Sequence, residues 1–309
     1  MKIALTGGAG FIASNIADEY IALGHEVHIF DNLSTGKLEN VNPKAKFHET
    51  DIRTPEIRRI FELEQFDIVN HHAAQMDVRV SVGNPAYDAG VNIIGSINVY
   101  EAALATGVKK IIFASTGGAV YGEADILPTS EDYPPKPCSP YGISKYANEK
   151  YLYYYSEIRK IETAILRYSN VYGPRQNAQG EAGVVAIFIG KMLQGEQPYI
   201  YGDGLNTRDY VFVSDVVKAN VLALSDAYKG IYNICTAIEV NVNEVFDKIK
   251  SITDAKCERV HLEGKQGEQR RSCCSYDKIK RELGWTPEID LEMGLQLTVE
   301  YFKKNVLSK

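Results

Sequence analysis

Tyr141 and Lys145 stand four residues apart in the segment Tyr-Gly-Ile-Ser-Lys. On a helix, residues at this spacing lie on one face. An ammonium group beside a phenol favours the phenolate, so the pair could accept a proton near neutral pH. A Tyr-x-x-x-Lys pair on an ordinary surface helix would have no function, so this interpretation depends on what the fold brings to the same place.

Two hydroxyl residues, Ser115 and Thr116, follow the apolar run 110–114. This run is typical of a buried strand, and ligands of parallel sheets bind outside the carboxyl ends of the strands. Thr116 could therefore donate a hydrogen bond to a substrate hydroxyl beside Tyr141. The alternative is that both hydroxyls only satisfy a turn.

A glycine-rich segment follows the first predicted strand, residues 3–5. Gly7 and Gly10 allow a tight turn in which the backbone can approach a ligand. The helix predicted for residues 11–23 would present its free N–H groups and its positive dipole end to that turn. This arrangement predicts a pyrophosphate-binding site.

The second predicted strand, residues 26–30, ends at Asp31. A carboxylate at this point accepts hydrogen bonds from ribose hydroxyls and repels a 2′-phosphate. The order strand, turn, helix, strand and Asp therefore predicts a dinucleotide site that takes NAD rather than NADP. A polar turn without a ligand is the alternative for Asp31 and Asn32.

Short strands and helices alternate through the first half of the chain, which predicts a doubly wound parallel α/β sheet, the Rossmann architecture. We interpret residues 1–169 as the NAD-binding Rossmann domain, to which about residues 208–234 return. Residues 170–309 are interpreted as a smaller C-terminal α/β lobe that binds the substrate. Further strands are predicted at 45–49, 66–70, 110–114 and 163–167, and helices at 55–62, at 85–106 and from Pro140, capped by Ser139.

The composition excludes several classes of protein. With 309 residues and a net charge of −6, the chain offers no electrostatic support for a nucleic-acid partner. The five cysteines form no Cys-x-x-Cys pair and the six histidines fall at no ligand spacing, so reduced thiols and no metal site are expected. No apolar run reaches the length of a membrane span, and the apolar N-terminus breaks at Gly7. We expect a cytoplasmic protein without a membrane partner.

Together, these motifs resemble the extended short-chain dehydrogenase/reductase family and, within it, the UDP-glucose 4-epimerases. The resemblance implies NAD as cofactor, a UDP-sugar as substrate, and a homodimer that pairs the helices at about 85–106 and 139–158. The stretches that carry it are Thr6–Ile12, Asp31–Ser34, His71–Gln75, Tyr141–Lys145, Arg167–Arg175, Arg208–Tyr210 and Leu283–Trp285.

The resemblance also implies a set of residues around the cofactor. Asp51 and Ile52 would contact the adenine, and Lys145 would bond the nicotinamide ribose. Catalysis would be carried out by Tyr141, Lys145, Thr116 and Ser115. The cofactor set is Gly7, Gly10, Phe11, Ile12, Asp31, Asn32, Ser34, Gly36, Asp51, Ile52, Ala73, Ala74, Gln75, Asn92, Tyr141, Lys145 and Tyr168.

On the substrate side, Asn170 and Arg208 would hold the diphosphate, because the planar fork of an arginine pairs with two oxygens. The Arg-x-Gly-Asp loop of the resembling enzymes reads Lys265-Gln-Gly-Glu268 here, which keeps the charge but loses that bidentate geometry. The implied substrate set is Thr116, Asn170, Val184, Tyr199, Tyr201, Arg208, Lys265, Glu268, Arg270 and Ser272.

Ser272 stands four residues after Glu268, at a position that borders C2 of the sugar in the resembling epimerases. A bulky aromatic residue there would crowd an N-acetyl group, whereas serine leaves the space open. The implied activity is therefore interconversion of UDP-glucose and UDP-galactose, and also of their N-acetylhexosamine counterparts, through a 4-keto sugar. The alternative is that Ser272 is a loop hydroxyl away from the sugar.

Two other functions fit the same fold. A sugar-nucleotide 4,6-dehydratase needs an extra acid and base, which that group places directly after the threonine, where this chain has Gly117 and Gly118. A non-catalytic NAD-binding protein would have no need of Tyr141, Lys145 and Thr116 together. Both alternatives are therefore less favoured than the epimerase.

Overall fold

The computed structural model describes residues 1–178, 183–264 and 269–305. Its centre is a seven-stranded sheet in the order β11-β6-β5-β4-β1-β2-β3, in which neighbouring strands are parallel. The strands are β1 (Lys2–Thr6), β2 (Glu26–Asp31), β3 (Lys46–Glu49), β4 (Ile68–His71), β5 (Lys110–Thr116), β6 (Glu162–Tyr168) and β11 (Gly230–Ile234). The predicted doubly wound parallel sheet is confirmed.

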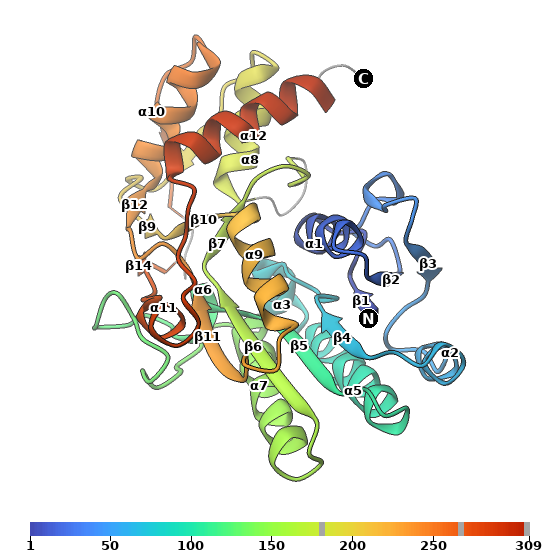
Figure 1. The fold of residues 1–309 in the computed structure, drawn as a ribbon. Coiled ribbons are helices and arrows are strands. Elements are labelled where there is room, and N and C mark those ends of the chain that lie inside the picture. The colour runs from blue at the N-terminus through green and yellow to red at the C-terminus, as the bar shows by residue number, and fades with distance from the viewer. Residues whose placement is uncertain (179–182, 265–268, 306–309) are drawn as a thin grey trace.

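Helices cover both faces of this sheet (Figure 1). On one face, α1 (Phe11–Ala22) and α9 (Val213–Ala223) pack in one apolar cluster with residues of β1 and β6. On the other, α2 (Glu56–Glu64), α5 (Ser96–Ala105) and α7 (Pro140–Glu157) share a second cluster. The chain reverses its direction of growth between β1 and β4, so a ligand crevice is expected at the carboxyl ends of these two strands.

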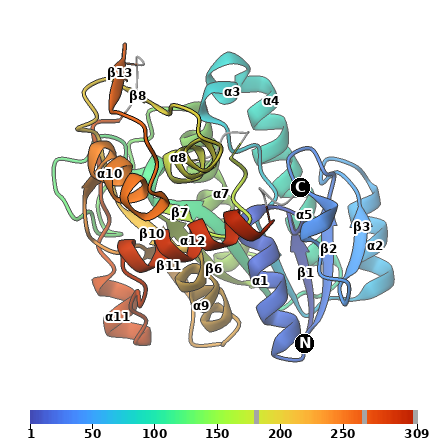
Figure 2. The same cartoon turned by 90° about the horizontal axis from the view of Figure 1, so that it is seen from above.

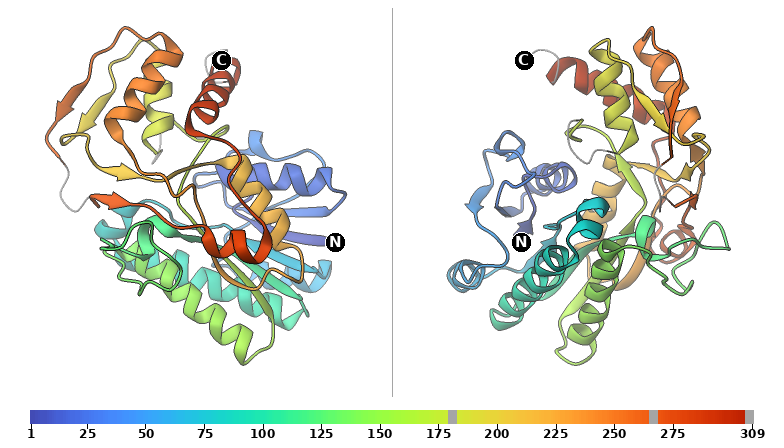
Figure 3. Two further views of the ribbon diagram at one scale, coloured as in Figure 1. Left: turned by 60° about the vertical axis from the view of Figure 1, so that its left-hand side comes forward. Right: turned by 180° about the vertical axis from the view of Figure 1, so that it is seen from behind.

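A second group of elements surrounds a third apolar cluster that includes Phe188, Phe246 and Phe302. Its helices are α8 (Val184–Leu193), α10 (Val242–Thr253) and α12 (Leu291–Asn305). Figures 1 and 3 show these three helices gathered beyond one end of the large sheet, and Figure 2 views the molecule from that end. The short strands nearby are β7 (Asn170–Tyr172), β8 (Tyr199–Tyr201), β9 (Thr207–Arg208), β10 (Tyr210–Phe212), β12 (Val240–Asn241), β13 (Val260–Leu262) and β14 (Arg271–Ser272).

Only part of the segment 208–234 joins the large sheet. Strand β11 lies at its edge and α9 covers one face, but β9 pairs with β12 and β14, and β10 pairs with β7. The return to the sheet therefore begins later than predicted. The helix α11 (Asp277–Leu283) contacts the edge strand β11 from the C-terminal part of the chain.

The long helix predicted for residues 85–106 is interrupted. It consists of α4 (Pro85–Ala89), a π-helical turn η2 (Gly90–Gly95) and α5, and the short helix α3 (Val78–Gly83) precedes it. A Cβ on Gly95 would lie 2.8 Å from the side chain of Ile52, so this turn approaches the segment after β3 closely. Short elements at loops are η1 (Leu38–Asn40) and α6 (Gly117–Val120). Within the described ranges, no helix has both the length and the apolar character needed to cross a bilayer.

Candidate active site

The glycine turn after β1 fits a ligand that contacts the backbone. Gly7 has φ +70°, and a Cβ on it would lie 2.7 Å from the backbone nitrogen of Ala73. Gly10 is the N-cap of α1 and has no side chain to cap the helix, so its own atoms do not cover this helix end. The predicted turn and helix start are confirmed, and the uncapped N-terminus of α1 suits an anion such as a pyrophosphate.

Asp31 ends β2 with its carboxylate almost fully buried. It accepts hydrogen bonds from the backbone N–H groups of Ala9 at 3.0 Å and Leu33 at 2.8 Å. A Cβ on Gly36 would lie 2.9 Å from both carboxylate oxygens, so only glycine fits against this group. Burial raises the pKa of Asp31, and hydroxyl donors from a ribose would offset that cost.

The remaining residues of the predicted adenine end lie around Asp31. Asn32 and Ser34 lie at the surface, and the side chain of Asn32 donates to Asp51 at 2.9 Å. Asp51 also receives the guanidinium of Arg53 at 2.6 Å, which lowers its pKa to about 2. Ile52 is buried beneath them. The carboxylate of Asp51 is thus held by protein groups at the surface of this end of the site.

The turn after β4 is fixed by Thr6. Its hydroxyl oxygen accepts the N–H groups of His72 and Ala73, at 3.2 and 3.1 Å, and lies 2.6 Å from Nδ1 of His71. His71 packs on Phe113 and His72 on Tyr168, on opposite faces of the sheet as predicted. This network holds Ala73 and the following Ala74 at the carboxyl end of β4, against Gly7.

Tyr141 and Lys145 lie on the first turns of α7, which starts as predicted. Ser139 accepts the N–H of Gly142 at 3.1 Å, and Pro140 is the first helical residue. Nζ of Lys145 donates to the carbonyl oxygen of Ala114 at 2.8 Å and lies 5.9 Å from the centre of the Tyr141 ring. The two side chains therefore share one face of the helix, at the end of β5.

Burial changes the pKa values of both members of this pair. Burial lowers the pKa of Lys145 from 10.5 to about 8. Burial also raises the pKa of Tyr141 above its ordinary value of 10, and the charge of Asp88 adds to this effect. In the protein without ligand, burial therefore favours the neutral phenol of Tyr141, and its role as a proton acceptor stays a prediction.

Ser115 and Thr116 diverge, as neighbours on a strand do. The buried Ser115 hydroxyl donates to Glu149 at 2.6 Å. Thr116 is half-buried at the site edge: a Cβ on Gly118 would lie 3.8 Å from the Thr116 hydroxyl and 3.6 Å from Oδ1 of Asn170. Thr116 and Asn170 thus flank Gly118, while Ser115 is held inside the protein.

The partner of Ser115 belongs to a buried network that the sequence analysis missed. Glu149 receives Nε and Nη2 of Arg167 at 2.9 and 2.6 Å, and Nη1 of Arg167 donates to the hydroxyl of Tyr121 at 2.8 Å. The available signal was spacing, since Glu149 follows Lys145 by four residues. Only the fold brings Arg167 of β6 to it.

The predicted substrate residues come from several elements. Arg208 of β9 pairs in register with Ser272 of β14. Tyr199 and Tyr201 are exposed on β8, and Val184 begins α8. Lys265 and Glu268 lie outside the described residues.

Arg270, also predicted to meet the substrate, is exposed and held by protein groups. Its guanidinium donates to both carboxylate oxygens of Asp203, at 2.8 and 2.9 Å, and to Asn206 at 2.9 Å.

Comparison with known proteins agrees with this geometry. Residues 3–235 match the NAD dependent epimerase/dehydratase family. The chain belongs to this family. The crystal structure of UDP-glucose 4-epimerase from Thermotoga maritima with UDP-glucose is 49% identical, with a TM-score of 0.96, over 99% of this chain and 100% of that one.

Two further structures are similar over nearly their whole length. UDP-glucose 4-epimerase from Thermus thermophilus in complex with NAD is 41% identical, with a TM-score of 0.94, over 99% of this chain and 100% of that one. UDP-N-acetylglucosamine 4-epimerase from Methanobrevibacter ruminantium, in complex with UDP-N-acetylmuramic acid, is 34% identical, with a TM-score of 0.92, over 98% of each chain.

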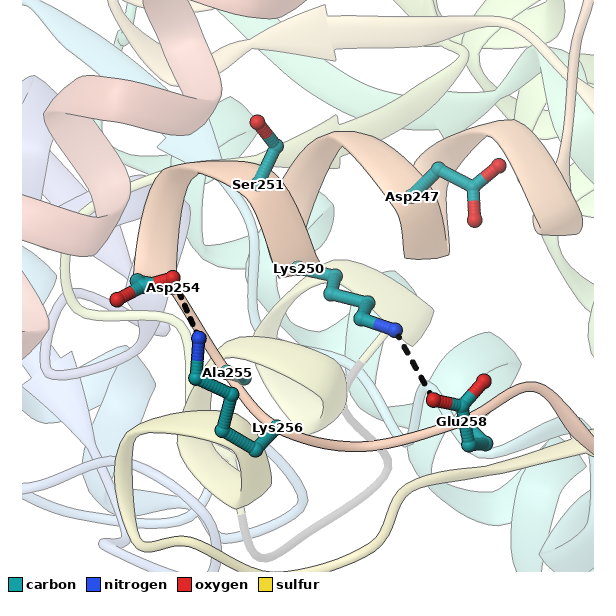
Figure 4. Close-up of a pocket in the computed structure, with 7 residues that line it drawn as sticks. All are labelled: Asp247, Lys250, Ser251, Asp254, Ala255, Lys256 and Glu258. Carbon is teal, nitrogen blue, oxygen red and sulfur yellow. Dashed lines mark hydrogen bonds and ion pairs between the residues drawn. The ribbon is translucent and has the colours of Figure 1, made fainter.

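Two hollows lie on different parts of the described structure. A small one is lined by Gly117, Gln269, Arg271, Ser272 and others. A larger one, of about 560 Å³, lies on the surface between the end of α10 and residues 255–258 (Figure 4). Its charged side chains pair with each other, as Lys250 does with Glu258, so it shows no unmatched group for a ligand among the residues described.

Two histidines that lie 20 residues apart in the sequence meet in the fold. His28 and His48 have no ligand spacing in sequence, yet β2 and β3 bring their ring nitrogens within 3.0 Å, with Glu64 close by. Glu64 forms ion pairs with Lys2 and Lys46, so its charge is already balanced there.

Proposed function

We propose that this protein is an NAD-dependent UDP-glucose 4-epimerase, which interconverts UDP-glucose and UDP-galactose through a 4-keto sugar. The observation that carries the proposal is the convergence of Tyr141, Lys145 and Thr116 at the carboxyl end of β5. That edge also carries the turn at Gly7 and the buried carboxylate of Asp31, which suit NAD. The high identity to a UDP-glucose 4-epimerase along the whole chain supports the substrate.

In this mechanism, Tyr141 accepts the proton of the sugar 4-hydroxyl and later returns it to the same oxygen, after the 4-keto sugar has presented its other face. NAD, when held there, would take up the hydride of C4 and give it back to the opposite face, and its positive charge would favour the phenolate. Lys145 remains an ammonium and stabilises that phenolate, and Thr116 donates a hydrogen bond to the reacting oxygen. The sugar presents its second face by swinging about its diphosphate, which Asn170 and Arg208 hold.

We assign Ser115 to positioning rather than to contact with the sugar. Its hydroxyl is bonded to Glu149, which Arg167 holds in turn, so it fixes β5 to α7. We propose that the other cofactor residues, from Gly7 to Tyr168, keep the roles that the resemblance implies. The same holds for the substrate residues from Val184 to Ser272. Lys265 and Glu268 are included in the substrate set on sequence alone.

The N-acetylhexosamine counterparts are proposed as further substrates. Ser272 is small and buried, and it lines the hollow beside Gly117, next to Thr116. The likeness to a UDP-N-acetylglucosamine 4-epimerase supports this range. A 4,6-dehydratase is disfavoured because Gly117 and Gly118 begin α6 where an acid and a base would be needed.

We also propose a cytoplasmic homodimer. All five cysteines are free thiols, which suits a reducing compartment. The helices α3 to α7 expose Val82, Ile94, Tyr153 and Ile158, with more than half of each side chain accessible. A second copy would cover this apolar surface. The division into an NAD-binding domain, residues 1–169 with part of 208–234, and a UDP-sugar-binding lobe, residues 170–309, is part of the same proposal.

One experiment tests the function directly. The purified protein is incubated separately with UDP-galactose and UDP-N-acetylgalactosamine, and the nucleotide sugars are separated and quantified. We expect both 4-epimers to reach equilibrium without added reductant. Formation of a stable 4-keto-6-deoxy product, or no conversion of UDP-galactose with NAD present, would contradict the proposal.

A further inference from the structure

Asp88 is a buried carboxylate beside the start of α7, and the mechanism above does not use it. It lies on α4 with no exposed surface. Its Oδ1 accepts hydrogen bonds from Nε2 of Gln75 at 3.0 Å and Nδ2 of Asn92 at 2.9 Å. Its Oδ2 accepts the hydroxyl of Ser144 at 2.6 Å. Three donors surround the group, which suits an ionised carboxylate that only accepts hydrogen bonds.

The three donors come from three different parts of the fold. Gln75 follows β4, Asn92 lies in the π-helical turn, and Ser144 directly precedes Lys145 on α7. Asn92 also receives the N–H of Gln75 on its Oδ1 at 2.8 Å, and its own carbonyl accepts Asn148 of α7 at 2.6 Å. Asp88 is therefore the centre of the contacts that join the loop after β4 to the catalytic helix.

Among residues 1–178, 183–264 and 269–305, Asp88 is bonded to the neutral side chains of Gln75, Asn92 and Ser144, and no basic side chain forms an ion pair with it. A buried charge without a partner is costly, so such a group persists where another buried charge balances it. The ammonium of Lys145, one residue from Ser144, supplies this balance. The charge of Asp88 raises the pKa of Lys145 against the effect of burial, and it also raises that of Tyr141.

The other titratable groups around Lys145 are neutral or already paired. Glu149, on the same helix, is bonded twice to Arg167. The charge of Lys145 also acts on His71, the last residue of β4, and on His72, but burial keeps their pKa values well below 6.5, so both are neutral at neutral pH.

The nearby phenols of Tyr100 and Tyr168 are also neutral, because burial raises their pKa values. Glu149 also raises the pKa of Lys145, but it is paired with Arg167, whereas Asp88 acts on both Lys145 and Tyr141.

We propose that Asp88 is a positioning residue for proton transfer, whose fixed negative charge keeps Lys145 an ammonium within the protein and whose bond to Ser144 holds the first turn of α7. The inference rests on the proposed function of Tyr141 as the proton acceptor. It assigns Asp88 an electrostatic role in addition to a structural one. The two roles are separable, because Asp88→Asn removes the charge and Ser144→Ala removes the bond while keeping the charge.

The first test is the pH profile of kcat for UDP-galactose, measured on the NAD-bound enzyme. Loss of the negative charge lowers the pKa of both Tyr141 and Lys145, so Asp88→Asn moves both limbs of the profile to lower pH, by about one unit. Ser144→Ala lowers the rate but leaves both midpoints where they are. An unshifted profile in Asp88→Asn, or an equal shift in Ser144→Ala, would overturn the proposal.

The second test does not require turnover. The NAD-bound protein is labelled with ¹³C at Cζ of tyrosine and titrated by NMR, and the Tyr141 signal is assigned by its loss in Tyr141→Phe. We expect the Tyr141 midpoint to fall in Asp88→Asn and to stay in Ser144→Ala. This readout separates the inference from the proposed function, since a correct Asp88 effect would appear even in a protein that does not epimerise UDP-galactose.

A second, smaller neutral variant tests whether misfolding explains the effect of Asp88→Asn. Asp88→Ser leaves space for a water molecule between the three donors and removes the same charge. We expect it to reproduce the shift seen in Asp88→Asn, with an unchanged circular dichroism spectrum. If both neutral variants unfolded while Ser144→Ala stayed folded, Asp88 would belong to the folding of this region, and the electrostatic role would be rejected.

Discussion

Lys145 donates a hydrogen bond from Nζ to the carbonyl oxygen of Ala114, at 2.8 Å. This bond ties the catalytic helix α7 to the strand that ends two residues later, at Thr116. It fixes the ammonium at the carboxyl end of the sheet, with the ring of Tyr141 on the same side. The candidate catalytic groups are therefore positioned by a contact between the Lys145 side chain of α7 and the backbone of β5. In the proposed mechanism, proton transfer depends on the charge of this buried lysine.

The first prediction concerns pH. Because burial lowers the pKa of Lys145 to about 8, the ammonium is present below that pH and is lost as the pH rises through it. We expect kcat/KM for UDP-galactose to fall above about pH 8. Lys145→Arg cannot lose its charge in this range, so its remaining activity should stay level across the same pH interval. A wild-type profile that rises steadily well above pH 8 would contradict this role of Lys145.

The second prediction concerns the base. Tyr141→Phe removes only the phenolic oxygen, so the fold and bound NAD should persist while turnover falls by about 10²–10⁴-fold. Tyr146→Phe makes the same change further along α7, where Lys150 lies over the ring, and should keep nearly full activity. Steady-state rates with UDP-galactose compare the two variants. Near wild-type turnover in Tyr141→Phe would show that another group moves the proton.

The third prediction concerns the choice of cofactor. The buried carboxylate of Asp31 should repel a 2′-phosphate, so the protein should bind NAD far more tightly than NADP. Asp31→Ala should weaken NAD binding and narrow the gap between the two. Calorimetric titration of protein stripped of nucleotide measures both affinities. Equal affinities in the unmutated protein would argue against Asp31 as the ribose partner.

The fourth prediction concerns assembly. Light scattering at micromolar concentration should give twice the mass of the 34.4 kDa chain. Tyr153→Asp places a charge on the exposed apolar surface of α7 and should shift the mass toward that of one chain. Met293→Asp adds the same charge on α12, outside the proposed interface, and should leave the mass unchanged. A monomeric wild-type protein would rule out the homodimer.

The fifth prediction concerns substrate range. Ser272→Tyr should suppress epimerisation of the N-acetylhexosamine nucleotides while sparing UDP-galactose, because the larger side chain fills the hollow beside Gly117. Ser275→Tyr is an unsuitable control, since the Ser275 hydroxyl accepts the N–H of Asp277, the first residue of α11. Ser272→Ala is the matched control and should keep both activities. Equal loss of both activities in the tyrosine variant would place Ser272 away from the sugar or make it structural.

Local features of the sequence determine much of the secondary structure and part of the candidate site of this protein. The turn at Gly7, the start of α7 at Pro140 and the shared face of Tyr141 and Lys145 follow from backbone geometry and helical period, which act over a few residues. The alternation of strands and helices was enough to predict the doubly wound sheet. The π-helical turn at residues 90–95 was missed, because nothing in the local sequence marks it; in the fold, its Gly95 lies close to Ile52, far away in sequence.

The tertiary structure alone decided the electrostatics of the site. Burial depends on everything that packs around a group, so the raised pKa of Tyr141 could not be read from its distance to Lys145 along the chain. Residues far apart in sequence meet in two networks. Ser115 and Arg167 both bond Glu149, and three donors enclose Asp88. Spacing predicted which side chains share a face, whereas their charge states follow from desolvation, which only the packed fold defines.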